Sequence, residues 1–493
     1  MIEPRDGWFD SRISAELADE PREVDQRIGV RDRSPGGTAS EDTQTPEERT
    51  PPMRDVERRV VVTGQGLISP FGWDRVAAYH AFVEGRAGVA PIRSFTVEGL
   101  PTSCGGEIAE FTDKSGKAMM PAKLARAYGK SLKYMARDIQ LAVVGAALAV
   151  GDAGLADGGV DPTRFGIDLG AGLISTELDE LATAIQTAYA AGDGTFDFAA
   201  WGTQSIPQIQ PIWLLRYLPN MLACHISILM DCQGPSNTVT QGEAAAALAI
   251  GEAARLIATD RADVMISGAA DSKIHPLSLV RMTMLGQIST WTGEPTEGCR
   301  PFDRAACGWL PGEGSGILVL EEREHALKRG ARIDAEVMGF GSGCDAVPGG
   351  LGTEGRGVEV AVVAALRDAG LQPDQLGLVV AHGSGVAAWD QAEARGLSRA
   401  LDGARVPVTG LKGHVGNSAS ASGTIEVMMG LQSLIAGRAP AIRNCVEPIT
   451  DQLDLIAGSP RDLSPDRPYV LKVGFTRLGQ ASALILKAET AAA

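Results

Sequence analysis

The stretch Gly234-Pro-Ser-Asn-Thr-Val-Thr-Gln-Gly-Glu243-Ala-Ala-Ala-Ala-Leu-Ala-Ile-Gly-Glu-Ala-Ala-Arg-Leu-Ile257 decides how this chain folds. Residues 236–240 form a short β-rich run, which predicts a strand. Residues 244–258 are rich in alanine and apolar on most faces, which predicts a buried helix. Glu243 stands between them, and a buried carboxylate is costly unless it is paired and hydrogen-bonded. This junction is therefore the first candidate for a functional site.

The alternation of β-rich and alanine-rich runs continues along the chain from residue 59. Strands are expected at residues 60–63, 165–169, 264–268, 376–381, 469–475 and 483–487, and helices at residues 137–153, 358–369 and 425–435. Short strands that alternate with buried helices predict an α/β fold whose strands are largely parallel and buried.

Composition sets limits on what the protein does. The chain has 493 residues, of which 44% are hydrophobic, so it can bury an ample core. A net charge of −16 argues against a nucleic-acid partner. No apolar run is long enough to span a bilayer and no signal peptide is found, so no membrane association is expected. The seven cysteines show no paired or metal-ligand spacing. We therefore expect buried structural cysteines, a cytoplasmic location, and neither metal nor cofactor.

The first part of the chain differs from the rest. Up to about residue 57 it is dominated by charged, small and turn-forming residues, with few large apolar side chains and no sustained period. Such a composition cannot offset the entropy lost on ordering. Residues 1–57 are therefore expected to be a flexible N-terminal extension.

Further segments extend the pattern around Glu243. They are residues 58–72, 219–227, 262–271, 299–303, 311–316 and 318–322. In this order, and with residues 234–257, they resemble the β-ketoacyl-acyl-carrier-protein synthase (ketosynthase) family. In that family a cysteine opens the buried helix, because a thiolate both attacks and leaves a thioester readily. By this resemblance Glu243 takes the place of the nucleophile.

The resemblance implies the thiolase fold, an α/β architecture of two similar βαβ halves in an α-β-α-β-α body. The N-terminal half is expected at residues 58–323 and carries Glu243. The C-terminal half is expected at residues 324–493 and carries the remaining site residues.

The first of these lies in His382-Gly-Ser-Gly-Val-Ala-Ala-Trp-Asp390-Gln-Ala-Glu393. In the family this motif supplies a histidine that binds the thioester carbonyl of the malonyl unit. His382 is therefore expected to be catalytic, with Asp390 and Glu393 as structural neighbours. Trp389 departs from the family's usual glycine.

The second family histidine follows a lysine by five positions. An alignment without gaps places Lys412 on the lysine and Asn417 on the histidine, while His414 falls three residues early. Asn417 can donate a hydrogen bond to a carbonyl but cannot shuttle a proton at neutral pH.

Two further positions complete the expected site. Glu313 belongs to the central signature and is expected to be structural. Arg477 stands where the family has a phenylalanine that gates the nucleophile. The resemblance implies that positions 243 and 477 approach each other across the bottom of the acyl tunnel. Opposite charges there predict an ion pair, joined by His382 or Asn417, that occupies the place where an acyl thioester forms.

Three functions remain open, and with them whether the chain is an enzyme. The first is a non-elongating partner similar to the chain-length factors of type II polyketide synthases. The second is a malonyl-carrier-protein decarboxylase that supplies starter units; relatives with this activity carry glutamine at the nucleophile position, and Gln241 lies two residues away. The third is an acyltransferase or hydrolase in which Glu243 is a general base.

The resemblance also implies partners. These are an acyl carrier protein and either a Cys-containing ketosynthase in a heterodimer or a second copy of this chain. The dimer interface is expected to be apolar and to include residues 236–240. Carrier proteins are typically acidic, so a local basic patch is needed. One candidate consists of Lys123, Arg126, Lys130, Lys133 and Arg137, which alternatively form a solvated helix face.

Overall fold

The computed structural model describes residues 58–189, 194–345 and 352–489. The expected flexible extension, residues 1–57, lies outside the described residues. One sheet of 11 strands runs through the described part in the order β12-β10-β9-β14-β15-β8-β1-β7-β6-β4-β5. Its strands are β1 (Val60–Ile68), β4 (Phe165–Ala171), β5 (Ser236–Val239), β6 (Val264–Ser272), β7 (Glu313–Glu322), β8 (Ala335–Cys344), β9 (Leu376–Val380), β10 (Pro407–Thr409), β12 (Asp454–Leu455), β14 (Tyr469–Phe475) and β15 (Gln480–Ala488).

The strand pairing shows that the two halves are built alike. In the order β1-β7-β6-β4-β5 the first two pairs are antiparallel and the last two are parallel. The order β8-β15-β14-β9-β10 repeats this pattern pair by pair. A short antiparallel pairing of β1 with β8 joins the two half-sheets. The duplication that the resemblance implied is therefore present in the sheet topology.

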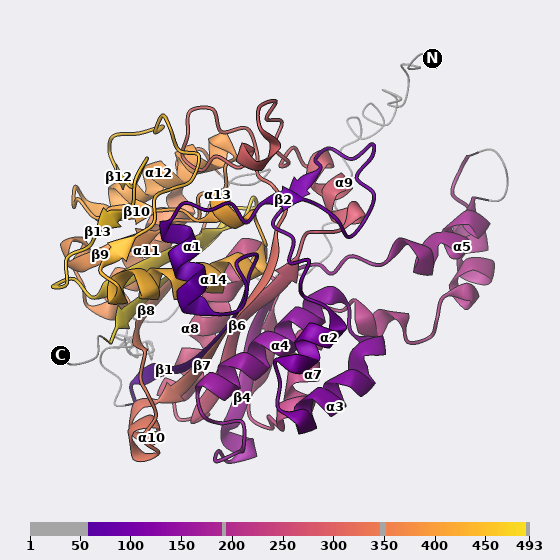
Figure 1. Ribbon diagram of the computed structural model, residues 1–493, viewed down its shortest axis with the longest axis horizontal. Coiled ribbons are helices and arrows are strands. Elements are labelled where there is room, and N and C mark those ends of the chain that lie inside the picture. The colour runs from indigo at the N-terminus through magenta and orange to yellow at the C-terminus, as the bar shows by residue number, and fades with distance from the viewer. Residues whose placement is uncertain (1–57, 190–193, 346–351, 490–493) are drawn as a thin grey trace, which may run out of the picture. The chain divides into compact units, whose positions relative to one another are not determined.

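Helices cover both half-sheets and fill the space between them. The two central helices are α8 (Ala245–Ala258) and α14 (Ser420–Ile435), and α14 contacts strands of both half-sheets. The alanines of α8 are nearly all buried, and their small side chains allow close packing on both sides. On the outer faces lie α4 (Arg137–Asp152) and α7 (Met221–Met230) for one half, and α11 (Arg356–Ala369) and α12 (Ala387–Leu401) for the other (Figure 1). The predicted thiolase fold with five layers is confirmed.

The remaining helices are shorter or lie at the periphery. They are α1 (Arg75–Val83), α2 (Asp113–Ala118), α3 (Ala122–Ser131), α5 (Leu178–Ala188), α6 (Phe198–Ala200), α9 (Pro276–Met284), α10 (Arg323–Lys328) and α13 (Lys412–Val415). Two pairs of very short strands, β2 (Ala90–Pro91) with β3 (Cys104–Gly105) and β11 (Arg438–Ala439) with β13 (Arg461–Asp462), complete the list. Within the described ranges no helix is both long enough and apolar enough to cross a bilayer.

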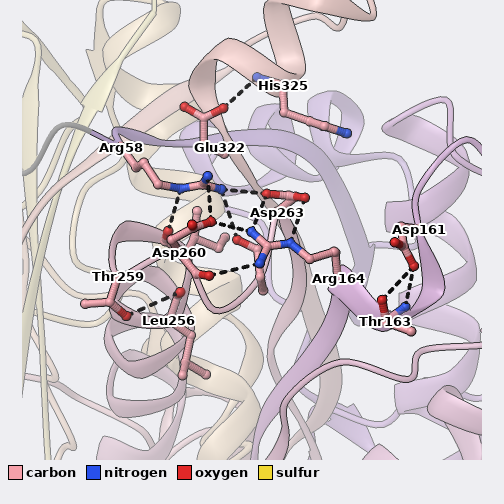
Figure 2. A network of polar contacts seen from close by, with 12 residues as sticks. Arg58, Asp161, Thr163, Arg164, Leu256, Thr259, Asp260, Asp263, Glu322 and His325 are labelled. Carbon is pink, nitrogen blue, oxygen red and sulfur yellow. Dashed lines mark hydrogen bonds and ion pairs between the residues drawn. The ribbon is translucent and has the colours of Figure 1, made fainter.

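An arginine–aspartate cluster ties three segments together at the start of β4 (Figure 2). Arg58, just before β1, lies 2.8 Å from Asp260 and 2.6 Å from Asp263, measured between side-chain nitrogen and oxygen. Arg164, just before β4, reaches the same two carboxylates at 2.5 and 2.8 Å. The hydrogen bonds from Arg164 and Arg58 outweigh burial and lower the pKa of Asp263 to about 2. The cluster lies at the N-terminal ends of β4 and β6, whereas Glu243 adjoins their C-terminal ends.

Strand β1 packs directly on the backbone of α4, which makes Gly145 a sensitive position. A Cβ atom on Gly66 of β1 would lie 2.0 Å from the carbonyl oxygen of Gly145, and one on Gly145 would lie 2.2 Å from Ser315 Oγ. Gly151, on the same helix, has no such neighbour within 4 Å. We expect Gly145→Ala to lower the free energy of unfolding by about 1–3 kcal/mol through overpacking.

The matched variant Gly151→Ala should raise the free energy of unfolding by up to about 1 kcal/mol, because alanine loses less entropy in a helix. Urea denaturation of both variants measures the difference. Equal effects of the two substitutions would contradict the close packing of α4 on Ser315 of β7.

Strand β5 is the edge of the sheet, but its side chains are not apolar. Ser236 and Asn237 are exposed and polar. The strand itself therefore adds little apolar surface to the expected dimer interface. Exposed large apolar side chains are instead carried by two other segments of the N-terminal half. They are Leu178, Ile185, Tyr189, Phe198, Ile206, Ile212, Leu214 and Leu215 on the segment from α5 to residue 215, and Leu277, Val280 and Met284 on α9.

Candidate functional site

The candidate site lies where the N-termini of the two central helices meet. Glu243 occupies a short 3₁₀ turn, Gly242–Ala244, that leads into α8, and Asn417 lies just before α14. A Cβ atom on Gly423 of α14 would lie 2.7 Å from the Cβ atom of Ala246 of α8. The positive ends of both helix dipoles point here, so the place favours negative charge.

Glu243 lines a pocket of about 210 Å³ together with Trp389, Thr476 and Arg477. Its side chain is half-buried. Burial raises the pKa of Glu243, and the positive charges of Lys412 and Lys273 partly offset that rise. Lys273 is itself paired with Asp271, with 2.5 Å between nitrogen and oxygen. The cations that act on Glu243 are therefore two buried lysines.

Arg477 lies on the wall of the same pocket but makes no contact with the carboxylate. Its side chain is exposed, and no ion pair within 4.0 Å joins it to Glu243, although both residues belong to the described part. Residue 477 sits in the tight turn between β14 and β15, where Thr476 N donates to Gln480 O at 2.9 Å. Because this turn carries the side chain outward, the predicted Glu243–Arg477 ion pair is wrong.

His382 is fully enclosed at the C-terminal end of β9. Its backbone N–H donates to Glu393 Oε1 at 2.6 Å, and its carbonyl oxygen accepts a hydrogen bond from Lys412 Nζ at 2.6 Å. The imidazole lies against Phe475, with 4.5 Å between ring centroids. Burial, with smaller effects from Lys412 and Lys472, lowers the pKa of His382 well below 6.5. The ring is therefore neutral at pH 7, and its Nε2 has no hydrogen-bond partner among the described residues.

The loop after His382 is fixed by the two carboxylates that the motif predicted as neighbours. Glu393 also accepts from Gly383 N at 2.9 Å, and Asp390 accepts from Ser384 N and Ser384 Oγ, both at 2.8 Å. Burial raises the pKa of Asp390 to about 6 and that of Glu393 to about 7. These bonds hold the backbone of the loop in one conformation, so the position of the imidazole is well defined.

A buried lysine–glutamate–lysine cluster lies beneath His382. Glu426 Oε1 is 2.9 Å from Lys412 Nζ, and Glu426 Oε2 is 2.7 Å from Lys472 Nζ. All three side chains are at most 4% exposed. Lys412 was expected in the site, whereas Lys472 and Glu426 were not. The available signal was a lysine in the otherwise apolar strand Tyr-Val-Leu-Lys-Val-Gly-Phe of β14.

Asn417 and His414, the two candidates for the second histidine position, lie in different surroundings. Asn417 is buried; its Oδ1 accepts from Ala419 N at 2.9 Å, while its Nδ2 has no partner among the described residues. His414 instead lies against Phe82 of α1, with its ring nitrogens 3.2 Å from Arg86 O and 3.0 Å from Ala441 O. His414 is thus part of the packing of α1 on the body.

His414 should make stability depend on pH. Burial lowers its pKa to about 4, whereas an unfolded histidine has a pKa near 6.5. Between these values only the unfolded state binds the proton, so the stabilising contribution of the neutral ring is lost as the pH falls from about 6.5 to about 4. We expect wild type to lose up to about 1.4 kcal/mol per pH unit more than His414→Gln over this range.

Denaturant titrations of the two proteins at several pH values measure that difference, because the carboxylate titrations common to both cancel. Parallel stability–pH curves would show that the imidazole does not titrate as described.

Glu313 is structural, and it removes one residue from the expected basic patch. Arg137 donates to Glu313 from Nε at 2.8 Å and from a terminal nitrogen at 2.6 Å. Ile108 N and Ser272 Oγ donate to the same carboxylate at 2.8 and 2.9 Å. Arg137 is therefore committed to an internal ion pair and cannot serve a docking surface. The other four members of the patch, Lys123, Arg126, Lys130 and Lys133, are exposed.

No cysteine takes the place of a nucleophile beside Glu243. All seven are free, and none lines the Glu243 pocket. Burial raises the pKa of Cys232, Cys299 and Cys445 to about 12, so these thiols stay protonated. Cys344 is exposed, which corrects the expectation that all seven are buried. Within the described ranges no three His, Cys, Asp or Glu side chains gather in a way that could hold a metal ion.

The arrangement can do limited chemistry. It offers two enclosed nitrogens without partners, His382 Nε2 and Asn417 Nδ2, which are suited to donate to a carbonyl oxygen. It offers a carboxylate with a raised pKa in a small pocket. A free carboxylate is a poor nucleophile toward a thioester.

Known proteins similar to this chain agree with the geometry. Residues 57–326 match the N-terminal domain of β-ketoacyl synthases, and residues 334–446 match the C-terminal domain. The chain is 33% identical to 3-oxoacyl-acyl-carrier-protein synthase 2 of Vibrio cholerae over 397 residues, which cover 80% of this chain and 90% of the relative. It is 31% identical to the ketoacyl synthase alpha subunit of the tetracenomycin polyketide synthase of Streptomyces glaucescens, over 89% of this chain and 99% of the relative.

Solved structures give the same result. A β-ketoacyl synthase from Burkholderia phymatum superposes with a TM-score of 0.75 at 28% identity, covering 88% of this chain and 100% of the other. The ishigamide ketosynthase/chain length factor superposes with a TM-score of 0.74 at 27% identity, covering 88% and 99%. With both domain models matched in order and the duplicated sheet in place, the chain belongs to the β-ketoacyl synthase family.

Proposed function

We propose that this chain is a non-elongating subunit that pairs with a Cys-containing ketosynthase in fatty acid or polyketide biosynthesis. The observation that carries the proposal is Glu243. It lies in the turn that leads into α8, and no cysteine lines the pocket around it. The sequence resemblance assigns this position to the family's nucleophile. Condensation needs an acyl-enzyme thioester, and a carboxylate with a raised pKa is a poor substitute for a thiolate.

The enclosed state of the remaining site residues supports the same role. His382 and Asn417 are each at most 1% exposed and do not line the Glu243 pocket. A protein that turned over thioesters alone would need these donors and the reacting residue to share one accessible space. Here they are separated, which fits a subunit that keeps the fold for assembly and leaves the chemistry to its partner.

The surface of the N-terminal half has two features suited to an interface with that partner. Strand β5 ends the sheet with unpaired backbone groups along its outer side. The exposed apolar side chains between α5 and residue 215 lie on the same half of the body. Patches of this kind on a protein surface are typical of protein–protein contacts. The ishigamide ketosynthase/chain length factor, to which this chain is similar, carries both kinds of subunit in its name.

An acyl carrier protein is the second proposed partner. Lys123, Arg126 and Lys130 on α3, with Lys133 just after it, are exposed on a chain whose net charge is −16. This local positive surface offers electrostatic steering to an acidic carrier protein. Charge reversal of Lys130 and Lys133 should test this docking. We expect the assembled pair with these substitutions to bind the acyl carrier protein more weakly than wild type at low salt.

Co-expression with the Cys-containing ketosynthases of the same genome tests the partner role. We expect one of them to co-purify in a 1:1 complex that survives size exclusion and native mass spectrometry. A chain that stays monomeric or pairs only with itself in the presence of all of them would contradict the proposal.

A malonyl-carrier-protein decarboxylase is the second candidate, favoured by one observation. His382 Nε2 and Asn417 Nδ2 are buried without partners, and such orphan donors are what a thioester carbonyl needs when carbon dioxide leaves. Release of carbon dioxide from malonyl-carrier protein by the isolated chain, lost in His382→Ala, would establish this activity.

A further inference from the structure

Two aromatic side chains, Trp389 and Phe475, connect the Glu243 pocket to the buried imidazole of His382. Trp389 lines the pocket beside Glu243. Its ring lies 6.3 Å from the ring of Phe475, measured between centroids, and Phe475 in turn lies 4.5 Å from His382. Phe475 is fully buried and Trp389 is half-buried. The contacts therefore run from the pocket through Trp389 and Phe475 to the imidazole.

The backbone is also closely packed beside Phe475. A Cβ atom on Gly474 would lie 2.8 Å from the carbonyl oxygen of Glu243, so the end of β14 is pressed against the start of α8. Phe475 is the next residue, and its ring lies against the imidazole of His382. A group that moves from the pocket along this line of contacts must therefore displace aromatic side chains before it reaches His382 Nε2.

Trp389 is held in place by its neighbours. It lies in the first turn of α12, next to Asp390, whose carboxylate accepts hydrogen bonds from Ser384 N and Phe302 N, both at 2.8 Å. One turn later Glu393 binds the backbone of His382 at 2.6 Å. The same anchors that position the imidazole thus fix the indole that covers the way to it.

We propose that Trp389, packed on Phe475, closes the passage between the Glu243 pocket and His382 Nε2. Trp389 then determines which groups gain access: ligands that enter the pocket meet Glu243 but not the buried imidazole. This inference does not rest on the partner role, because it concerns access within one chain.

Diethyl pyrocarbonate, which modifies neutral imidazoles that it can reach, tests the closure in the full chain. Exposed His80 is the internal reference for reactivity. Buried His414, whose ring nitrogens both face carbonyl oxygens, is the reference for folding. In wild type, peptide mass spectrometry should find His80 modified and both His382 and His414 protected.

In Trp389→Gly we expect the modification rate of His382 to rise at least about tenfold, the ratio that corresponds to about 1.4 kcal/mol of opening free energy. His80 should be unchanged and His414 still protected. Trp389→Phe should protect His382 as wild type does. The matched control Trp291→Gly removes another half-buried tryptophan, which lies over Arg300 outside the pocket, and should leave His382 protected.

Two results overturn the closure. One is modification of His382 in wild type as fast as that of His80. The other is a protected His382 in Trp389→Gly. If His414 becomes reactive in Trp389→Gly, that substitution has disturbed the fold. The modification rate of His382 is then compared between wild type and Trp389→Leu. A protected His382 in that variant then counts against the proposal.

Discussion

Replacing Glu426 by glutamine is expected to lower the free energy of unfolding by about 3–5 kcal/mol, because it leaves two buried ammonium groups without a counter-charge. Lys412 and Lys472 both pair with this one carboxylate, at 2.9 and 2.7 Å. The substitution keeps the shape of the side chain, so packing changes little. This loss of free energy of unfolding should become smaller as the pH rises toward 10, because a deprotonated lysine no longer needs a negatively charged partner. Burial already lowers the pKa of Lys472.

Glu359 provides a matched control for this prediction. It also pairs with two cations, Arg356 at 2.9 Å and Arg399 at 2.6 Å, but both arginines are exposed. We expect Glu359→Gln to cost less than about 1 kcal/mol, since water and salt screen exposed pairs. Guanidinium unfolding at one protein concentration measures both variants. If Glu426→Gln and Glu359→Gln lower the free energy of unfolding by similar amounts, burial does not determine how much the Glu426 ion pairs stabilise the protein.

The second large effect concerns the reconstituted pair of subunits. Replacing the nucleophilic cysteine of the partner by alanine should reduce formation of the 3-oxoacyl product by at least about 10³-fold, as expected when a covalent intermediate cannot form. Replacing Glu243 of this chain by glutamine removes its charge but no thioester chemistry. We therefore expect product formation within about threefold of wild type.

The difference between these two expected effects distinguishes a non-elongating subunit from an enzyme that uses Glu243. Quantifying the product by mass spectrometry over a fixed time gives both numbers, and native mass spectrometry confirms that each variant pair is still assembled. A loss with Glu243→Gln as large as the loss with the partner's substitution would mean that Glu243 takes part in the reaction.

Much of the fold could be predicted because local pattern and burial agree in this chain. The β-rich run at residues 469–475 is observed as β14 (Tyr469–Phe475), and the alanine-rich run at residues 137–153 as α4 (Arg137–Asp152). Strands β7 and β8 were missed as strands. Both contain glycines, which weaken the β pattern, and in β8 these glycines allow the helix α11 to approach closely.

The site was harder to predict because it depends on side-chain direction. The family resemblance and the opposite charges favoured an ion pair between residues 243 and 477, but Arg477 lies exposed in the turn after β14. The charges near Glu243 come from Lys412 and Lys273, which lie 169 and 30 positions away in the sequence. Only the tertiary fold brings the two helix N-termini and these lysines together. The motif around His382 was recognisable because its carboxylates bind backbone groups only a few residues away.

The central claim, that this chain carries no acyl intermediate, is tested most directly by its intact mass after incubation with an acyl-carrier-protein thioester. A Cys-containing ketosynthase treated in parallel serves as the positive control and should gain the mass of the acyl group. We predict that this chain keeps its unmodified mass, alone and in the proposed pair, because a carboxylate is a poor nucleophile toward a thioester and no cysteine lines the pocket around Glu243. An acyl adduct on Glu243 or on any cysteine of this chain would contradict the account.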